Sequence, residues 1–210
     1  MRTSSCVGIL LAGGLARRMG GGDKALRKSG GISLLAHVIA ALQPQCEGLV
    51  LSANGDPARF AGFDLPIVAD DLPGFMGPLA GILAGLDWIA ALHPDVPSAI
   101  SVPADTPFLP GDLAARLMDA RAKDNALIAC ARSGGRTHPA VAVWPVSIRN
   151  DVRHALVVED MRKVEAFLQN YSRAIVEWPI QPYDPFFNAN DPSDLAAAET
   201  ILARRDNHLA

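Results

Sequence analysis

The stretch that decides the fold is Leu11-Ala12-Gly13-Gly14-Leu15-Ala16-Arg17-Arg18-Met19-Gly20-Gly21-Gly22-Asp23-Lys24, which directly follows the apolar run Cys6–Leu11. Its glycines let the backbone come close to a ligand, and successive N–H groups can converge on phosphate oxygens. The cations Arg17, Arg18 and Lys24 add positive charge at the same place. A phosphate site at the end of a first strand is therefore predicted. The glycine spacing matches neither of the two common phosphate-loop motifs, so a solvated glycine-rich loop is the alternative.

Outward from this stretch, apolar runs of strand length alternate with helical patterns. Strands are predicted at residues 6–11, 48–53, 65–69, 99–102 and 126–131, and helices at 33–42, 78–92 and 111–123. The uninterrupted apolar strands are typical of a buried parallel sheet. This order predicts an α/β fold with a doubly wound, Rossmann-like and mostly parallel sheet that carries helices on both faces.

The pattern changes at Ser133-Gly134-Gly135-Arg136, which predicts a turn. Residues 126–131 and 138–144 are expected to pair antiparallel across it. A helical insertion at 146–168, a strand at 174–178 and a closing helix from residue 191 follow. There is no internal repeat and no linker long enough to divide the chain, so residues 1–210 are expected to form a single domain.

Composition limits the partners. The net charge is −3, from 19 basic and 22 acidic residues, which gives no basic face for nucleic acid. No apolar run approaches the length of a membrane span, and the N-terminus does not resemble a signal peptide, so a cytoplasmic protein is expected. Cys6 and Cys130 lie in apolar runs and are interpreted as core thiols, and Cys46 forms no close sequence pair with either.

Carboxylates follow two of the predicted strands. Asp105 comes directly after the apolar run 99–102, at the edge of the sheet where the glycine-rich stretch begins. An aspartate there can hold Mg²⁺ together with substrate phosphates, or it can form a turn before Pro107. Asp70 and Asp71 end another strand at the same edge and are candidates for a sugar, base or metal contact.

Together, the motifs LAGG-x-A-RRMGG-x-DK, GPLAGI, P-x-DTPF, HPAVAVWP and FFNANDPSDL resemble the molybdenum cofactor guanylyltransferase (MobA) family, in order over about residues 6–200. The resemblance implies transfer of GMP from GTP to molybdopterin, with Mg²⁺ as cofactor and pyrophosphate as the second product. Transient contact with a cofactor-delivery protein or an apo-molybdoenzyme is also implied, and a monomer is expected.

The resemblance assigns roles to individual residues. Leu11, Ala12 and Gly13 would contact the nucleotide through the backbone, Lys24 and Arg18 would bind phosphates, Asp70 would lie beside the nucleoside, and Asp105 would hold Mg²⁺. The catalytic set is then Arg18, Lys24 and Asp105, with Asn188 and Asn190 on the pterin side. His138 is interpreted as a structural histidine at the start of a strand, with a place in the cleft as the alternative.

One position departs from the family pattern. The family often carries Asn-Ala-Asn where this chain has Ser52-Ala53-Asn54, and a serine cannot provide the paired donor and acceptor of an amide. Guanine selectivity is therefore open, with a molybdopterin cytidylyltransferase or a sugar-phosphate nucleotidyltransferase as alternatives. A non-catalytic nucleotide-binding or cofactor-delivery protein is the alternative from another class.

Overall fold

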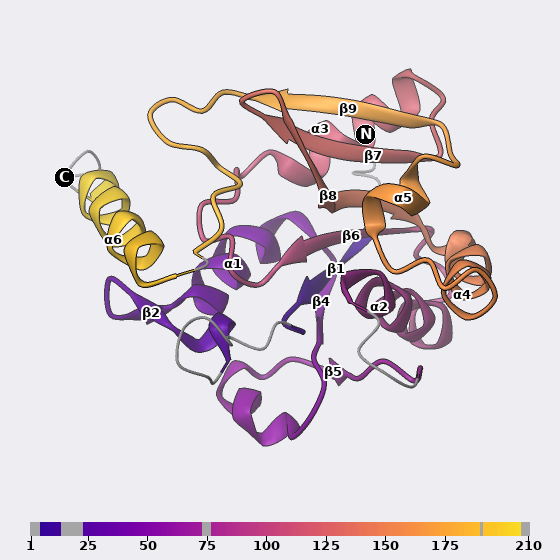
Figure 1. Ribbon diagram of the computed structural model, residues 1–210, viewed down its shortest axis with the longest axis horizontal. Coiled ribbons are helices and arrows are strands. Elements are labelled where there is room, and N and C mark those ends of the chain that lie inside the picture. The colour runs from indigo at the N-terminus through magenta and orange to yellow at the C-terminus, as the bar shows by residue number, and fades with distance from the viewer. Residues whose placement is uncertain (1–4, 14–22, 73–76, 190, 207–210) are drawn as a thin grey trace.

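The computed structural model describes residues 5–13, 23–72, 77–189 and 191–206, and its main sheet has seven strands in the order β5-β4-β1-β6-β8-β7-β9 (Figure 1). A separate hairpin pairs β2 (Lys28–Ser29) with β3 (Ile32–Ser33). The strands of the main sheet are β1 (Cys6–Leu11), β4 (Gly48–Ser52), β5 (Ile67–Val68), β6 (Ser98–Pro103), β7 (Ile128–Ser133), β8 (Arg136–Pro145) and β9 (Arg173–Trp178). All are parallel to their neighbours except β8, which confirms the predicted mostly parallel sheet.

The antiparallel addition also lies where the sequence predicts it. Strand β8 pairs antiparallel with both β6 and β7, so it lies inside the sheet rather than at its edge. The turn between β7 and β8 contains Gly134 and Gly135, with φ of 53° and 77°. Positive φ at both central residues is what a tight hairpin turn requires, and glycine adopts it without steric cost.

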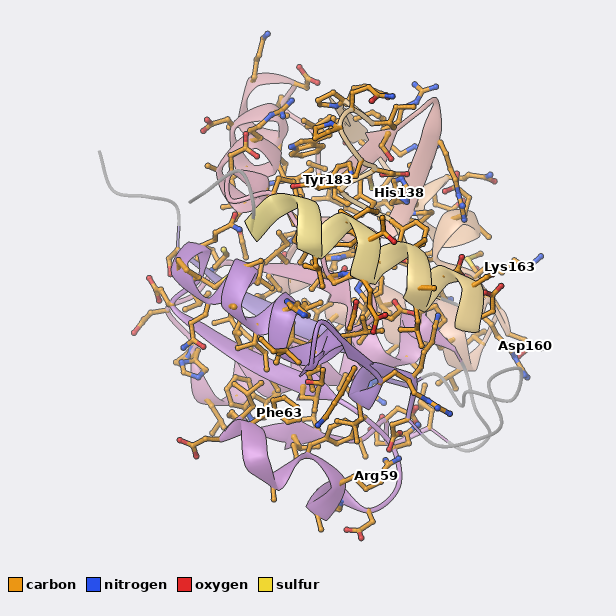
Figure 2. The ribbon with its side chains drawn as sticks, turned by 90° about the vertical axis from the view of Figure 1, so that its left-hand side faces the viewer. Arg59, Phe63, His138, Asp160, Lys163 and Tyr183 are labelled. Atoms are coloured by element: carbon orange, nitrogen blue, oxygen red, sulfur yellow. The ribbon has the colours of Figure 1, made fainter. Side chains whose placement is uncertain are left out.

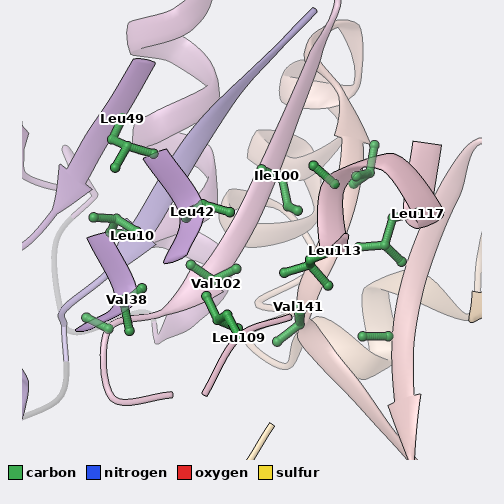
Figure 3. Packing of buried hydrophobic residues seen from close by; sticks show 14 of the residues in the cluster. Leu10, Val38, Leu42, Leu49, Ile100, Val102, Leu109, Leu113, Leu117 and Val141 are labelled. Atoms are coloured by element: carbon green, nitrogen blue, oxygen red, sulfur yellow. The ribbon is translucent and has the colours of Figure 1, made fainter. Parts of the chain in front are cut away.

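Helices cover both faces of the sheet. On one face α1 (Leu34–Leu42) and α3 (Leu113–Lys123) pack on residues such as Leu10, Ile100 and Val141, and Figure 3 shows this packing. On the other face lie α2 (Pro78–Leu92), α4 (Arg149–Val157) and α5 (Val164–Leu168). The last helix, α6 (Pro192–Asp206), packs beside the β2–β3 hairpin, at the left of Figure 1.

Helix α2 begins and ends at the predicted residues and is buried along most of its length. It packs on the central strand β1 so closely that a Cβ placed on Gly85 would lie 2.6 Å from two atoms of Ile9. The glycine therefore sets the distance between helix and sheet. Because β1 and α2 both border the site described below, this contact also positions the site.

We expect Gly85→Ala to lower the free energy of unfolding by about 1–3 kcal/mol, because the added methyl group overpacks Ile9 by more than alanine's higher helix propensity offsets. The melting temperature should fall by several degrees for a chain of this length. Gly62→Ala is the matched control, since no atom lies within 4 Å of a Cβ at that position. A Gly85→Ala protein as stable as the control in thermal denaturation would show that the contact is not tight.

The cysteines and histidines form no metal site among the described residues. Cys6 and Cys130 are buried in the core, as predicted. The fold brings Cys46 close to Cys6, with 3.9 Å between the sulfur atoms, although forty residues separate them in sequence. The part of the chain that the structure describes has no helix that combines the length and apolar character of a membrane span.

Candidate active site

A cavity of about 340 Å³ opens at the carboxyl ends of β1, β4 and β6. Between β1 and β6 the strand order of the sheet reverses, which is the place where doubly wound sheets bind ligands. The cavity is lined by Leu11, Gly13, Ser52, Ala53, Asn54, Asp70, Gly77, Pro78, Gly81, Pro103, Asp105, Ala140 and Asn188.

Backbone hydrogen bonds beyond the strand ends fix the floor of this cavity. The N–H of Ala104 donates to the carbonyl of Leu11 over 3.0 Å, and the N–H of Ala12 donates to the carbonyl of Ser52 over 2.9 Å. These bonds continue the sheet one residue past each strand. Leu11 and Ala12, where the glycine-rich stretch begins, are therefore held against β4 and β6.

Lys24 contacts Asp105, which lines the cavity, although eighty-one positions separate the two residues. The Lys24 ammonium donates to Oδ2 of Asp105, and both side chains are mostly buried. The other carboxylate oxygen, Oδ1, is buried and has no hydrogen-bond partner among the residues that the structure describes. A buried carboxylate oxygen that lacks a donor carries a desolvation penalty, which a cation bound at this position would remove.

Asp70 and Asp71 have different environments. Asp70 lines the cavity and makes two hydrogen bonds with the side chain of Asn54. The Asp70 carboxylate accepts one from Asn54 Nδ2 over 2.6 Å, and the Asp70 backbone N–H donates the other to Asn54 Oδ1 over 3.0 Å. Asp71 is exposed and pairs with Arg153 of α4. The structure therefore brings Asp70, and not Asp71, to the cavity.

Ser52 lies in the cavity wall against the first turns of α2. A Cβ at Gly81 would lie 2.8 Å from the Ser52 hydroxyl and 3.2 Å from a Leu11 methyl group, so only glycine leaves this part of the wall open. The GPLAG motif thus provides a flat backbone surface beside a single hydroxyl group. Such a surface suits the face of a base or ribose.

Some of the predicted residues lie outside the described parts of the chain, among them Arg17, Arg18 and Asn190. Asn188 is described and lines the cavity, where its Oδ1 accepts from the hydroxyl of Thr106 over 2.7 Å. Leu11, Ala12, Gly13, Lys24, Asp70 and Asp105 are thus brought to one end of the sheet. No contact in this region tests the predicted role of Arg18.

The fold also adds residues that sequence reasoning missed. Arg59 joins the end of the glycine-rich stretch to the end of β4, because it binds both the Asp23 carboxylate, over 2.5 Å, and the Asn54 carbonyl. Thr106 is fully buried beside Asp105. Thr106 stands in the quoted DTP motif, so the sequence offered a signal for it, whereas Arg59 lies in the short 3-10 helix Pro57–Phe63, which belongs to none of the quoted motifs.

His138 has the structural role that the sequence predicts, away from the cavity lining. Its Nε2 lies 2.7 Å from the Ser133 hydroxyl, and its ring packs 4.9 Å from that of Phe186. Burial lowers the pKa of His138 below its usual value, as does Arg136, while the carboxylates of Asp184 and Glu177 act in the opposite direction.

This lowered pKa predicts how stability depends on pH. Because unfolded His138 takes up a proton near pH 6.5 and folded His138 does so only at lower pH, acidification favours the unfolded chain. The contribution of His138 to the free energy of unfolding should be complete above about pH 6.5 and decline as the pH falls towards the pKa of the folded state. In urea titrations, lowering the pH from 7.5 to 5.5 should reduce the free energy of unfolding less in His138→Gln than in wild type. Parallel pH profiles would contradict the assignment.

Together, a glycine-rich sequence that begins at the end of β1, a strand-end carboxylate and a switch-point cavity are the features of a nucleotidyltransferase of the doubly wound α/β class. Residues 8–174 match the family described as the MobA-like NTP transferase domain, and the chain belongs to that family. It is 61% identical over 196 residues to the molybdenum cofactor guanylyltransferase of Rhodopseudomonas palustris (strain BisB5), covering 93% of each chain. It is 60% identical over 204 residues to the protein of that name from Bradyrhizobium sp. (strain ORS 278), covering 97% of this chain and 96% of the relative.

Solved structures support the fold. Molybdopterin-guanine dinucleotide biosynthesis protein A from Archaeoglobus fulgidus superimposes with a TM-score of 0.73 at 22% identity, over 94% of this chain and 99% of that one. Rv0371C from Mycobacterium tuberculosis, solved as a complex with manganese, has a TM-score of 0.67 at 13% identity, over 93% of this chain and 98% of that one. The sequence-based assignments of fold class and family are confirmed.

Proposed function

We propose that this chain transfers GMP from GTP to the terminal phosphate of molybdopterin, in its molybdenum-bound form, and so forms molybdopterin guanine dinucleotide and pyrophosphate. Relatives with the name molybdenum cofactor guanylyltransferase share about three-fifths of its residues over nearly the whole of each chain, which supports this reaction. The cavity is also large enough to enclose a substantial part of a nucleotide.

The observation that carries the proposal is the buried Oδ1 of Asp105, which has no hydrogen-bond partner within the described part of the chain, while Oδ2 binds Lys24. A carboxylate oxygen of this kind is the ligand that Mg²⁺ prefers, and few protein ligands are needed because substrate phosphates complete the coordination. We therefore assign Mg²⁺ to Asp105. The ion would neutralise phosphate charge and orient the triphosphate for attack.

The residues of the chain then have complementary tasks. Lys24 and the N–H groups after β1 bind and orient the triphosphate, and Arg18 supplies a second phosphate cation. Leu11, Ala12 and Gly13 hold the nucleotide through the backbone, while Asp70 lies on the nucleoside side. The acceptor phosphate is already anionic at neutral pH, so no strong general base is required, and the transfer proceeds without a covalent enzyme intermediate.

The wider setting is also a proposal. The 210 residues act as one nucleotidyltransferase domain, as a monomer in the cytoplasm. The product passes to a cofactor-delivery protein or an apo-molybdoenzyme through transient contact. Neither nucleic acid nor a membrane takes part, in keeping with the small net charge.

Cytidylyl transfer is the second candidate because Ser52, and not an amide, lies in the cavity wall. We expect purified protein with molybdopterin and Mg²⁺ to release pyrophosphate at least about tenfold faster from GTP than from CTP. Ser52→Asn should raise this ratio about tenfold, because an amide adds a paired donor and acceptor for guanine. The KM for molybdopterin serves as an internal control and should not change. A preference for CTP would make the chain a cytidylyltransferase.

A further inference from the structure

The segment that joins β9 to α6 crosses the molecule without regular secondary structure and reaches the cavity with Asn188. We call residues 183–189 the crossing segment. Figure 2 views this side of the molecule and labels Tyr183 and His138 above helix α6. An irregular segment of this length normally samples many conformations, and ordering each residue costs conformational entropy. The crossing segment is nevertheless fixed at both of its ends by side chains from distant elements.

The outer end is fixed by a chain of hydrogen bonds from the β7–β8 hairpin. The Ser133 hydroxyl donates to Oδ1 of Asp184 over 2.8 Å, and the same oxygen accepts from the N–H of Phe186 over 2.9 Å. Because this hydroxyl has only one hydrogen, Nε2 of His138 must be the donor in its 2.7 Å contact with Ser133. The three side chains therefore have one consistent donor order, from His138 through Ser133 to Asp184.

Aromatic packing strengthens the outer end. Phe186 is buried between the ring of His138 and that of Trp178, with ring centres 4.9 Å and 5.3 Å away. Phe108, which follows β6, contacts Tyr183 at 5.3 Å and Phe187 at 6.2 Å. The crossing segment thus packs on both halves of the sheet.

The inner end is tied to the loop that carries the proposed metal ligand. The Thr106 hydroxyl donates to Oδ1 of Asn188 over 2.7 Å, and the N–H of Ala189 donates to the Asp105 carbonyl over 3.3 Å. Asn188 and Asp105 are therefore held in a fixed relative position. Ser133, His138 and Asp184 do not line the cavity, so they would act on a ligand indirectly, by holding the crossing segment.

We propose that Ser133, His138 and Asp184 are positioning residues for the acceptor substrate. They hold the crossing segment in place so that Asn188 can contact the acceptor, a phosphate monoester that carries a hydrogen-bonding heterocycle. This inference rests on the proposed function, because it takes the Asn188 side of the cavity as the acceptor side. A preordered segment lets the acceptor bind without the entropy cost of ordering the chain at that moment. The nucleotide side is built on β1, β4 and α2 and does not depend on these contacts.

The test compares Ser133→Ala with wild type in steady-state kinetics with molybdopterin as acceptor. We expect the KM for molybdopterin to rise about tenfold, as the loss of a hydrogen bond to a charged group predicts, with kcat at saturation within about twofold. The Kd of a non-hydrolysable GTP analogue, measured by calorimetry, should not change. Asp184→Ala is the second variant in case Ser133→Ala does not fold, because it removes the acceptor of the Ser133 hydrogen bond. Ser133→Thr should restore the KM, and exposed Ser147→Ala is the matched control.

Amide hydrogen exchange without substrate gives a readout that does not depend on the reaction. Exchange in residues 183–189 should be at least about tenfold faster in Ser133→Ala than in wild type, while exchange in β1 and α2 stays the same. Unchanged exchange there, an unchanged KM for molybdopterin, or a parallel loss of GTP-analogue affinity would overturn the inference. If wild type transfers no nucleotide to molybdopterin, the proposed function fails, and with it the acceptor role, whereas the exchange experiment still decides whether the anchor exists.

Discussion

An Asp105→Asn enzyme is expected to lose nucleotidyl transfer by about a thousandfold or more in kcat/KM, because the change removes the charge of the proposed metal ligand. The amide keeps the size of the side chain, and its oxygen can still accept a hydrogen bond from Lys24. A large loss with an unchanged melting temperature would therefore be chemical rather than structural. Pyrophosphate release in the presence of GTP, molybdopterin and Mg²⁺ measures it.

The matched control is Asp71→Asn, which makes the same change at an exposed carboxylate one residue beyond Asp70. Its pair with Arg153 is exposed, so activity should stay within about twofold of wild type. Metal binding should also be lost in Asp105→Asn and kept in Asp71→Asn. Mn²⁺ titrations followed by electron paramagnetic resonance would measure this loss of the proposed metal site. Full activity in Asp105→Asn would remove Asp105 from the metal site.

Lys24→Met is expected to have two effects of opposite sign. Loss of the ammonium group should reduce kcat/KM for GTP about a hundredfold, because Lys24 no longer stabilises phosphate charge. Without nucleotide, the same variant should bind Mn²⁺ more tightly than wild type, because the Lys24 ammonium contacts Asp105 and competes with a cation for its carboxylate. In wild type, nucleotide should relieve this competition, because its phosphates would bind Lys24 in place of Asp105.

Lys28→Met is the control, because Lys28 is exposed on β2 and has no ion pair with Asp105. Both its kcat/KM and its Mn²⁺ affinity should equal those of wild type. If Lys24→Met bound Mn²⁺ no better than wild type in the absence of nucleotide, the contact with Asp105 would not restrict metal binding. A normal kcat/KM for GTP would take Lys24 out of the phosphate site.

Most of the fold could be predicted because its signals are local. Helix α2 matches its predicted bounds since Gly77-Pro78 fixes its start and an apolar pattern fills the rest. The two glycines after Ser133 likewise predicted the β7–β8 hairpin. Strand β5 is shorter than predicted, with two residues, because only Ile67 and Val68 pair with β4 before the chain turns away.

The site was predictable where motifs stand at the ends of strands. Asp105 and the glycine-rich stretch follow neighbouring parallel strands, so the topology itself brings Asp105 and Lys24 together. The choice between Asp70 and Asp71 was not predictable from periodicity, because it depends on the direction in which the chain leaves β5. Contacts such as Ser133–Asp184 and Cys6–Cys46 join distant residues through irregular segments, and no local pattern encodes them.

The most direct test of the central claim follows the nucleotide itself. Purified protein is incubated with molybdopterin, Mg²⁺ and GTP radiolabelled at its α-phosphate, and the products are separated from the protein. The account predicts that the label appears in molybdopterin guanine dinucleotide, in equal amount to the pyrophosphate released, with none bound to the protein. Label that stays in GTP, or that becomes covalently attached to the protein, would contradict direct transfer of GMP to molybdopterin.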